Sequence, residues 1–326
     1  MSRKTLYMHV GFPKTGTTTI QSNLALCSAR LRAAGICQPD RLGRDAPGHH
    51  RVVDLVRTEG AQGFVEYLTE VLDLDRMVLS SESISGLIKK RSELWSEDLV
   101  DRLKTKFDVI PIIVLRRQDY MLESSVAQRA KHEKRLDLSF ETSDAQRYRY
   151  DYLRVTDALA RSFGQENVRV VIYRDDVPKD IWQAFCAVLG IDLDLPGQSR
   201  PRLNQKPHRR KVLALSQLEG INRSAGEDLL DAMVASDAIK DDGEPFLFSP
   251  ADRRALLRAN AAANRAICEQ FGIPEDDAAY FAATEVCDDW AAPEPIRSGE
   301  WAAFVSDMVQ FLKKRYRDGS GVSPRP

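Results

Sequence analysis

Short apolar runs alternate with longer amphipathic stretches up to residue 190 of the chain. Four runs rich in β-branched and other apolar residues have the length of buried strands: 5–10, 77–79, 109–115 and 168–173. Helix-like segments lie between them, including 17–34, 96–107, 120–131 and 145–163. Strands that alternate with helices indicate a parallel sheet covered on both faces. The pattern therefore predicts a three-layer α/β domain with about four or five central strands and helices on both faces.

The alternation stops after Leu189-Gly190, where a Pro-, Gly- and Arg-rich stretch, 195–210, leads into mostly helical sequence. The clearest helix predicted there is 250–271, with Ser249 as its N-cap, and a final amphipathic helix is predicted over 299–316. We therefore expect residues 1–195 to form the α/β core. Residues 196–326 are expected to form a mostly helical part of the same domain.

Composition excludes some classes of partner without identifying a function. The chain has 326 residues, of which 43% are hydrophobic and 29% charged, as expected for a globular protein. A net charge of −1 provides no overall attraction to nucleic acid or to an acidic membrane surface. Five cysteines without metal-ligand spacing favour free thiols in a reducing compartment. No apolar run has the length of a membrane span, so we expect a cytoplasmic protein, whose oligomeric state the sequence leaves open.

Residues 11–19 read Gly-Phe-Pro-Lys-Thr-Gly-Thr-Thr-Thr and connect the first predicted strand to the first predicted helix. The amides and the dipole at a helix N-terminus bind anions, and Gly16 lets the backbone approach an oxyanion closely. A Walker loop for ATP has lysine directly after this glycine, whereas here Thr17 follows and the lysine is Lys14. The segment predicts a P-loop-like phosphate site with a different lysine contact. The plainer alternative is a helix cap rich in Gly and Thr.

A second anion site is indicated where the strand 109–115 ends. Arg116 and Arg117 follow that strand, and Ser124 and Ser125 lie eight positions after each of them. An arginine at a strand end and a serine on the next helix can converge on one phosphate. The spacing fits both pairs, and the alternative is that all four are solvated surface residues.

Together these features resemble sulfotransferases that use 3′-phosphoadenosine 5′-phosphosulfate. The loop of that family reads Pro-Lys-Thr-Gly-Thr-Thr, which matches residues 13–18, and its 3′-phosphate motif places a serine eight residues after an arginine. Family members have that arginine immediately after the apolar strand, which favours Arg116 with Ser124. The strand 168–173 is similar to a family strand that ends in Tyr-Glu-Asp-Leu, although Arg174 replaces the acidic residue. The resemblance covers residues 1–190 in four landmarks.

The resemblance implies transfer of a sulfuryl group to a hydroxyl, or an amine, of a carbohydrate or another small acceptor, leaving adenosine 3′,5′-bisphosphate. Lys14 would stabilise charge on the leaving phosphate, and Arg116 and Ser124 would hold the 3′-phosphate. The residues expected around the 5′-phosphate are Lys14, Thr15, Gly16, Thr17, Thr18 and Thr19. A transferring sulfuryl group carries less negative charge than a phosphoryl group, so no metal is expected.

Glu82 follows the strand 77–79 through Ser80-Ser81, where the family carries its catalytic base. The resemblance therefore implies that Glu82 accepts the proton of the acceptor hydroxyl. A carboxylate can do so when partial burial raises its basicity. The alternative is that Glu82 caps a turn or pairs with an arginine.

Residues 196–326 are expected to contribute to the acceptor and 3′-phosphate sites. In related enzymes a late Arg or Lys reaches the 3′-phosphate, and the candidates in 200–211 are Arg200, Arg202, Lys206, His208, Arg209, Arg210 and Lys211. A run of charges is nevertheless usually a solvated face. His49 and His50 are candidates for lining the acceptor pocket, and without carboxylate or cysteine partners at ligand spacing they do not predict a metal.

Two other functions are compatible with such a loop. One is an ATP- and Mg²⁺-dependent kinase of small molecules or sugars, against which the displaced lysine argues. The strand ends also lack a clear Walker B aspartate, since they read Ser80-Ser81 and Arg116-Arg117. The other is a non-catalytic protein that binds a phosphorylated or sulfated partner.

Overall fold

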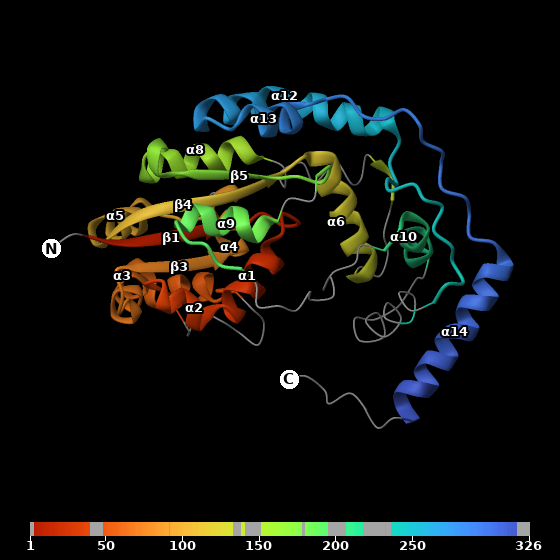
Figure 1. Ribbon diagram of the computed structural model, residues 1–326, viewed down its shortest axis with the longest axis horizontal. Coiled ribbons are helices and arrows are strands. Elements are labelled where there is room, and N and C mark those ends of the chain that lie inside the picture. Colours follow the sequence, from red (N-terminus) through yellow and green to blue (C-terminus); the bar gives the residue numbers. More distant parts are fainter. Residues whose placement is uncertain are drawn as a thin grey trace. The chain divides into compact units, whose positions relative to one another are not determined.

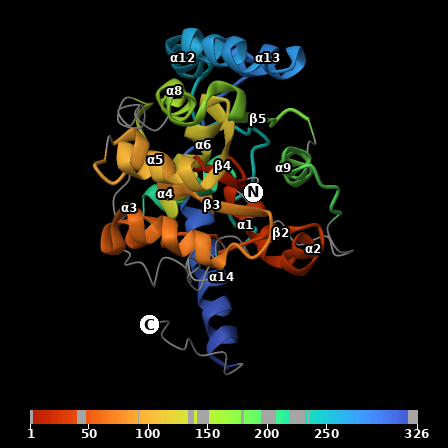
Figure 2. The ribbon, with the colours of Figure 1, turned by 90° about the vertical axis from the view of Figure 1, so that its left-hand side faces the viewer.

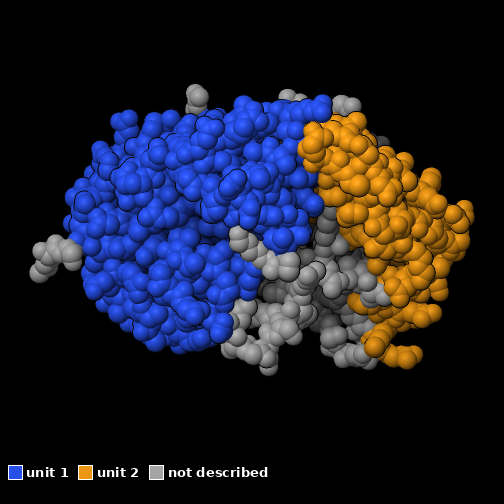
Figure 3. Space-filling model, turned by 45° about the horizontal axis from the view of Figure 1, so that its top comes forward, with its two compact units in different colours: residues 1–121, 147–199, 257–284 blue, residues 122–146, 200–256, 285–326 orange. Residues whose placement is uncertain are grey.

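The computed structural model describes residues 3–39, 48–90, 92–132, 138–140, 151–177, 180–194, 207–217, 232 and 236–317. The chain forms two compact units, which are coloured separately in Figure 3. Unit 1 comprises residues 1–121, 147–199 and 257–284, and unit 2 comprises residues 122–146, 200–256 and 285–326. Two of the five boundaries between the units fall inside the helices α6 (Gln118–His132) and α12 (Pro250–Phe271).

Unit 1 contains a five-stranded sheet with the strand order β2-β3-β1-β4-β5 (Figure 1). Its strands are β1 (Lys4–Val10), β2 (Ile36–Cys37), β3 (Arg76–Ser81), β4 (Phe107–Arg116) and β5 (Arg169–Tyr173). Every neighbouring pair is parallel. The α/β class and the parallel sheet predicted from the alternating pattern are confirmed. The pattern does not predict β2, because two residues are too few to show a period.

Helices cover both faces of this sheet, as Figure 2 shows. On one face lie α1 (Thr17–Leu26), α2 (Ser28–Ala33) and α9 (Ile181–Leu189). On the other face lie α3 (Val52–Val71), α4 (Glu82–Lys89), α5 (Glu97–Lys106) and α8 (Tyr152–Phe163). The core under α1 and α9 includes Tyr7, Val78, Ile112 and Val114 from the strands and Ile20, Leu24, Trp182 and Phe185 from the helices. Unit 1 also contains a 3₁₀ turn, Gln165–Asn167, and α13 (Glu275–Ala282).

Local sequence explains most helix starts. Ser96 and Asp151 cap α5 and α8, since their side chains accept hydrogen bonds from Leu99 N (3.2 Å) and Arg154 N (3.2 Å). The helix predicted over 17–34 is instead two helices separated at Cys27, whose φ of −92° and ψ of 12° end α1. No glycine or proline marks this break, so the pattern does not reveal it. The predicted start at 145 lies outside the described residues.

Unit 2 is helical, as the C-terminal pattern predicts. It contains α10 (Arg209–Ser216), the first part of α12 and α14 (Ser298–Arg317). Ser249 is confirmed as a cap, because its hydroxyl oxygen accepts from Asp252 N at 3.2 Å. The buried carboxylate of Glu123 accepts from Leu247 N (2.9 Å) and Phe248 N (3.0 Å), which fixes the chain ahead of α12. Among the described helices, none combines the length and apolar character of a membrane crossing.

Candidate functional site

The carboxyl edge of the sheet in unit 1 collects most of the predicted site residues. Because the strands are parallel, their carboxyl ends lie at one edge, where ligands of open α/β sheets usually bind. Val10 at the end of β1 pairs with Ser81 of β3, so the loop 11–16 and Glu82 start side by side. His9 pairs with Ile112, and β4 continues to Arg116, which therefore reaches past the end of β1.

The loop between β1 and α1 is a tight turn with a left-handed backbone at Lys14 and Gly16. Their φ values are 64° and 80°, and Lys14 is the one non-glycine residue with positive φ among those described. The hydroxyls of Thr15 and Thr17 both donate to the carbonyl oxygen of Phe12, at 2.8 and 3.0 Å. Left-handed residues alternating with ordinary ones turn successive amides to one side, which suits an anion. Holding Lys14 in this conformation costs about 1 kcal/mol, and such strain collects at functional sites.

Gly11 and Gly16 permit close approaches around this turn. A Cβ at Gly11 would lie 2.9 Å from Thr17 Cγ2 and 3.0 Å from Glu82 Cγ. A Cβ at Gly16 would lie 3.2 Å from the Tyr173 ring, in a conformation that side chains rarely adopt. Both positions therefore need glycine, one to bring Glu82 against the loop and the other to begin α1.

Glu82 is the first residue of α4 and is half-buried beside the loop. The Ser85 hydroxyl donates to Gly11 O at 2.6 Å, which links α4 to the loop. Burial raises the pKa of Glu82, against the smaller opposing effects of the Thr17 hydroxyl and of nearby basic groups, Lys14 and Lys89 among them. The carboxylate is thus more basic than an ordinary glutamate, as a general base requires.

Arg116 ties the ends of β4 and β5 to the loop. Its Nη1 donates to Lys14 O at 2.9 Å, and its Nε donates to Asp175 Oδ2 at 2.8 Å. Its Nη2 donates to the other oxygen of Asp175, and the guanidinium lies 5.1 Å from the centre of the Tyr173 ring. From the sequence, Arg116 is expected to hold the 3′-phosphate, and that role stays a prediction. The guanidinium is, however, already bidentate on a carboxylate.

Arg117 is likewise paired. Its Nε and Nη2 donate to the two oxygens of the fully buried Asp119, at 2.8 and 2.7 Å. The two serines of the predicted 3′-phosphate motif lie on α6, in unit 2, where Ser124 is half-buried and Ser125 is buried. The choice between Arg116 with Ser124 and Arg117 with Ser125 therefore stays a prediction.

The other predicted residues occupy different surroundings. Thr18 and Thr19 are exposed on the first turn of α1. His49 is buried. Its ring Nδ1 accepts a hydrogen bond from Ser80 N at 2.8 Å, and its backbone N–H donates to Ser80 O at 2.8 Å. Burial lowers the pKa of His49 to about 4, so it is neutral at pH 7. His50 is half-buried, and when protonated it lowers the pKa of Glu82.

Two arginines of the basic stretch are structural in unit 2. Arg209 is buried and pairs with Asp242 at 2.8 Å, and Arg210 is buried and pairs with Glu300 at 2.8 Å. The expectation of a solvated charge run is wrong for these two, because acidic residues distant in sequence neutralise them. Arg200, Arg202 and Lys206 lie outside the described residues. His208 caps α10, accepting from Lys211 N at 3.3 Å.

Two side chains at this edge were missed as site residues by sequence reasoning. Asp175 lies two residues after the end of β5, and an acidic residue near a strand end was the available signal for an arginine partner. Lys89 lies seven positions after Glu82 on α4, and its Nζ sits 4.6 Å from the centre of the Phe12 ring. The helical period alone places Lys89 and Glu82 on one face.

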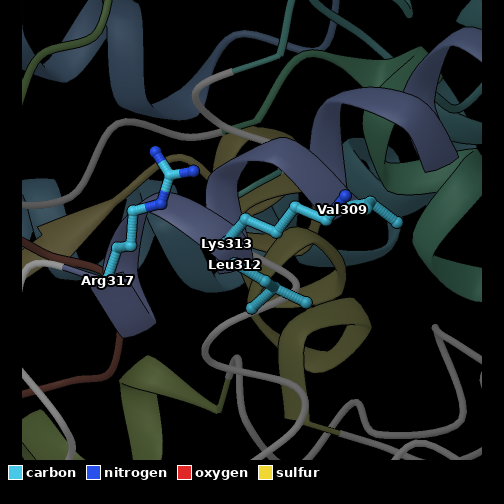
Figure 4. Close-up of a pocket in the computed structure, with 4 residues that line it drawn as sticks. All are labelled: Val309, Leu312, Lys313 and Arg317. Atoms are coloured by element: carbon cyan, nitrogen blue, oxygen red, sulfur yellow. The ribbon is translucent and has the colours of Figure 1, made fainter.

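A separate pocket of about 510 Å³ lies on α14 in unit 2 (Figure 4). Its described lining residues are Val309, Leu312, Lys313 and Arg317. None of these four belongs to the predicted constellation, so the pocket does not enter the site. Among the described residues, no group of three or more His, Cys, Asp or Glu side chains is arranged to hold a metal ion. Comparisons with protein-family models and with curated proteins found no match.

Proposed function

We propose that the protein is a sulfotransferase that transfers a sulfuryl group from 3′-phosphoadenosine 5′-phosphosulfate to a hydroxyl of a carbohydrate or another small acceptor. One observation carries this proposal. A strained lysine loop at a helix N-terminus and a carboxylate with a raised pKa lie against each other at one sheet edge, around Gly11. The first suits a phosphate leaving group, and the second suits deprotonation of an alcohol.

The loop fits the 5′-phosphate end of this donor substrate. The amides at the start of α1 and the left-handed Lys14 and Gly16 suit an oxyanion, and Thr18 is exposed on the same turn. At the 3′-phosphate end, Arg116 already donates to Asp175 and to Lys14 O. A phosphate bound by Arg116 would therefore share the guanidinium with Asp175 or replace it.

The donor brings a sulfuryl group joined to its 5′-phosphate through a bridging oxygen. Glu82 accepts the proton of the acceptor hydroxyl as the acceptor oxygen forms its bond to sulfur. The bond between sulfur and the bridging oxygen breaks, and its electron pair stays on the departing phosphate. Lys14 and the loop amides stabilise that developing negative charge. The products are the sulfated acceptor and adenosine 3′,5′-bisphosphate.

The first test is a calorimetric titration with adenosine 3′,5′-bisphosphate, followed by an acceptor screen with sulfur-labelled donor. Adenosine 5′-monophosphate is the matched ligand, since it lacks the 3′-phosphate. We expect tighter binding of the bisphosphate and transfer of label to an acceptor without added Mg²⁺. ATP- and Mg²⁺-dependent phosphorylation instead would identify a kinase, and binding without transfer to any acceptor would identify a non-catalytic binder.

The second test concerns Glu82. Glu82→Ala should lower turnover by about a hundredfold or more, since a general base contributes 10²–10⁴-fold. Glu93→Ala is the matched control, because Glu93 is exposed beyond the end of α4. Affinity for the bisphosphate should stay unchanged in both variants. Near-normal turnover of Glu82→Ala on its acceptor would remove the base assignment.

A further inference from the structure

The face of α4 that begins at Glu82 is open at its middle. Glu82, Gly86 and Lys89 are spaced i, i+4 and i+7, so they share one face of the helix. Apart from its chain neighbours and the nearby backbone of α4, no atom of the described residues comes within 4 Å of a Cβ placed at Gly86. Gly86 is half-buried rather than fully exposed. Among the described residues, space is therefore open over Gly86, on the helix face that also carries Glu82.

Basic residues act on this carboxylate. Lys14 and Lys89 lower the pKa of Glu82, as His50 does when protonated, and the three come from separate segments. The Lys89 side chain extends back along α4 toward the loop, because its Nζ lies 4.6 Å from the centre of the buried Phe12 ring. In the proposed reaction Lys14 serves the donor phosphate. Lys89 and His50 have no role in donor chemistry, yet they lie beside the proton acceptor.

We propose that the acceptor lies over Gly86 and carries an anionic group that Lys89 binds. This inference rests on the proposed sulfotransferase function. The anion is a carboxylate or a phosphate or sulfate monoester, as in a uronic acid or a sugar phosphate. Seven residues of α-helix rise about 10 Å, a length that a monosaccharide and the two flanking side chains span. Lys89 thus determines specificity, and Glu82 remains the base.

The test compares acceptors that carry a neutral, an anionic or a cationic substituent. Aryl glucoside, the matching glucuronide, the glucoside 6-phosphate and the 2-amino-2-deoxyglucoside share one ring. A hydrogen bond between charged groups contributes about 1.5–3 kcal/mol, so wild type should prefer an anionic acceptor over the glucoside by roughly 10- to 100-fold in kcat/KM. The carboxylate and phosphate arms identify which anion is the better substrate.

Variants at Lys89 then separate recognition from folding. Lys89→Gln should remove the preference for the anionic acceptor, and Lys89→Glu should reverse it toward the amino sugar. Lys90→Glu is the matched control, because Lys90 is the exposed C-cap of the same helix and makes the same change of charge. A purely structural role of Lys89 over Phe12 would alter stability and leave the ratio of acceptors unchanged.

A substitution at Gly86 tests the space itself. Gly86→Leu should raise the KM for the acceptor at least tenfold and leave the affinity for adenosine 3′,5′-bisphosphate unchanged. Replacing a helix-interior glycine should also stabilise α4, so loss of activity would not reflect unfolding.

The two proposals fail in different ways. If wild type does not bind adenosine 3′,5′-bisphosphate, the sulfotransferase function fails. If it binds the nucleotide but sulfates charged and neutral acceptors alike, or keeps its preference in Lys89→Glu, only the anionic-acceptor proposal is overturned.

Discussion

Two parts of the same sheet edge differ in whether their basic side chains pair directly with carboxylates. The loop after β1 collects backbone amides and a strained lysine, while the nearby carboxylate of Glu82 is buried enough to have a raised pKa. The ends of β4 and β5 instead pair each arginine directly with a carboxylate, Arg116 with Asp175 and Arg117 with Asp119. An anion bound at the loop would be held by backbone amides and a lysine. An anion bound by Arg116 or Arg117 would instead have to replace or share the carboxylate partner of that arginine.

This difference means that a basic residue in a motif does not by itself define an anion site. Whether a basic residue can bind a further anion depends on the carboxylate with which it already pairs. For Arg116 that carboxylate is Asp175, two residues after the end of β5. The hydrogen bond from Arg116 to Lys14 O also joins the two regions, so a change at Asp175 reaches the loop. The predictions below act on one region at a time.

Lys14→Ala should have the largest effect, lowering turnover by about a hundredfold or more, because the charge that stabilises the leaving phosphate is lost. Lys14→Arg should recover part of this activity. Single-turnover assays with labelled donor measure the chemical step directly, and Lys90→Ala provides a control for loss of a nearby lysine. Near wild-type turnover of Lys14→Ala would show that the loop is an ordinary helix cap.

Asp175→Asn should free Arg116 and tighten binding of adenosine 3′,5′-bisphosphate by about tenfold, the effect of one charge-assisted hydrogen bond. The unliganded variant should be less stable than wild type, because breaking a buried pair leaves an uncompensated charge. Nucleotide should restore more stability to this variant than to wild type. Calorimetry and thermal unfolding measure both effects.

Asp176→Asn is the matched control for that change, since Asp176 pairs with Arg174 at the same strand end. Equal tightening in both variants would indicate a general charge effect. Tightening in neither would exclude Arg116 as a phosphate ligand and leave it as a brace for the loop.

Lys14→Gly should be more stable than Lys14→Ala by about 1 kcal/mol, because alanine keeps the left-handed strain that glycine relieves. Both variants lack the amine and should be equally inactive. At Lys90, where φ is −82°, the order should reverse, with alanine more stable than glycine. Urea unfolding measures the four variants, and an unchanged order at Lys14 would contradict the strained loop.

Glu82→Gln should raise the free energy of unfolding at pH 7, by less than the effects predicted above. The folded pKa of Glu82 is raised above its unfolded value, so the ionised carboxylate destabilises the folded state at high pH. That penalty disappears as pH falls through the raised pKa, and below the unfolded value the variant and wild type should converge. Urea unfolding at pH 7 and pH 4 tests this, with Glu93→Gln as control.

The sequence predicts the fold well because its strands are strongly apolar and separated by long helices. The runs at 5–10, 77–79, 109–115 and 168–173 all correspond to observed strands. The break at Cys27 and the edge strand β2 are not predictable in this way. Tertiary packing determines both, and neither has a glycine, proline or periodic signal.

The functional roles of Lys14, Glu82 and Arg116 stay predictions. Each of these residues lies no more than four positions beyond the last residue of a parallel strand, or is that last residue, and this places all three at one edge of the sheet. Their neutralisation depends on residues distant in sequence, such as Asp175, and on the tilt of long side chains such as Lys89. Neither follows from spacing along the chain. Only the three-dimensional structure shows that the guanidinium of Arg116 already donates hydrogen bonds to Asp175 and to Lys14 O.

Gly11 carries one hydrogen atom where any other amino acid would press on Thr17 and Glu82. The distance between Glu82 and the loop 11–16 thus depends on a gap the size of a methyl group. Alanine at this position would leave the five strands in place while pushing α4 and α1 apart. The fold would then persist, while Glu82 would lie farther from the loop 11–16.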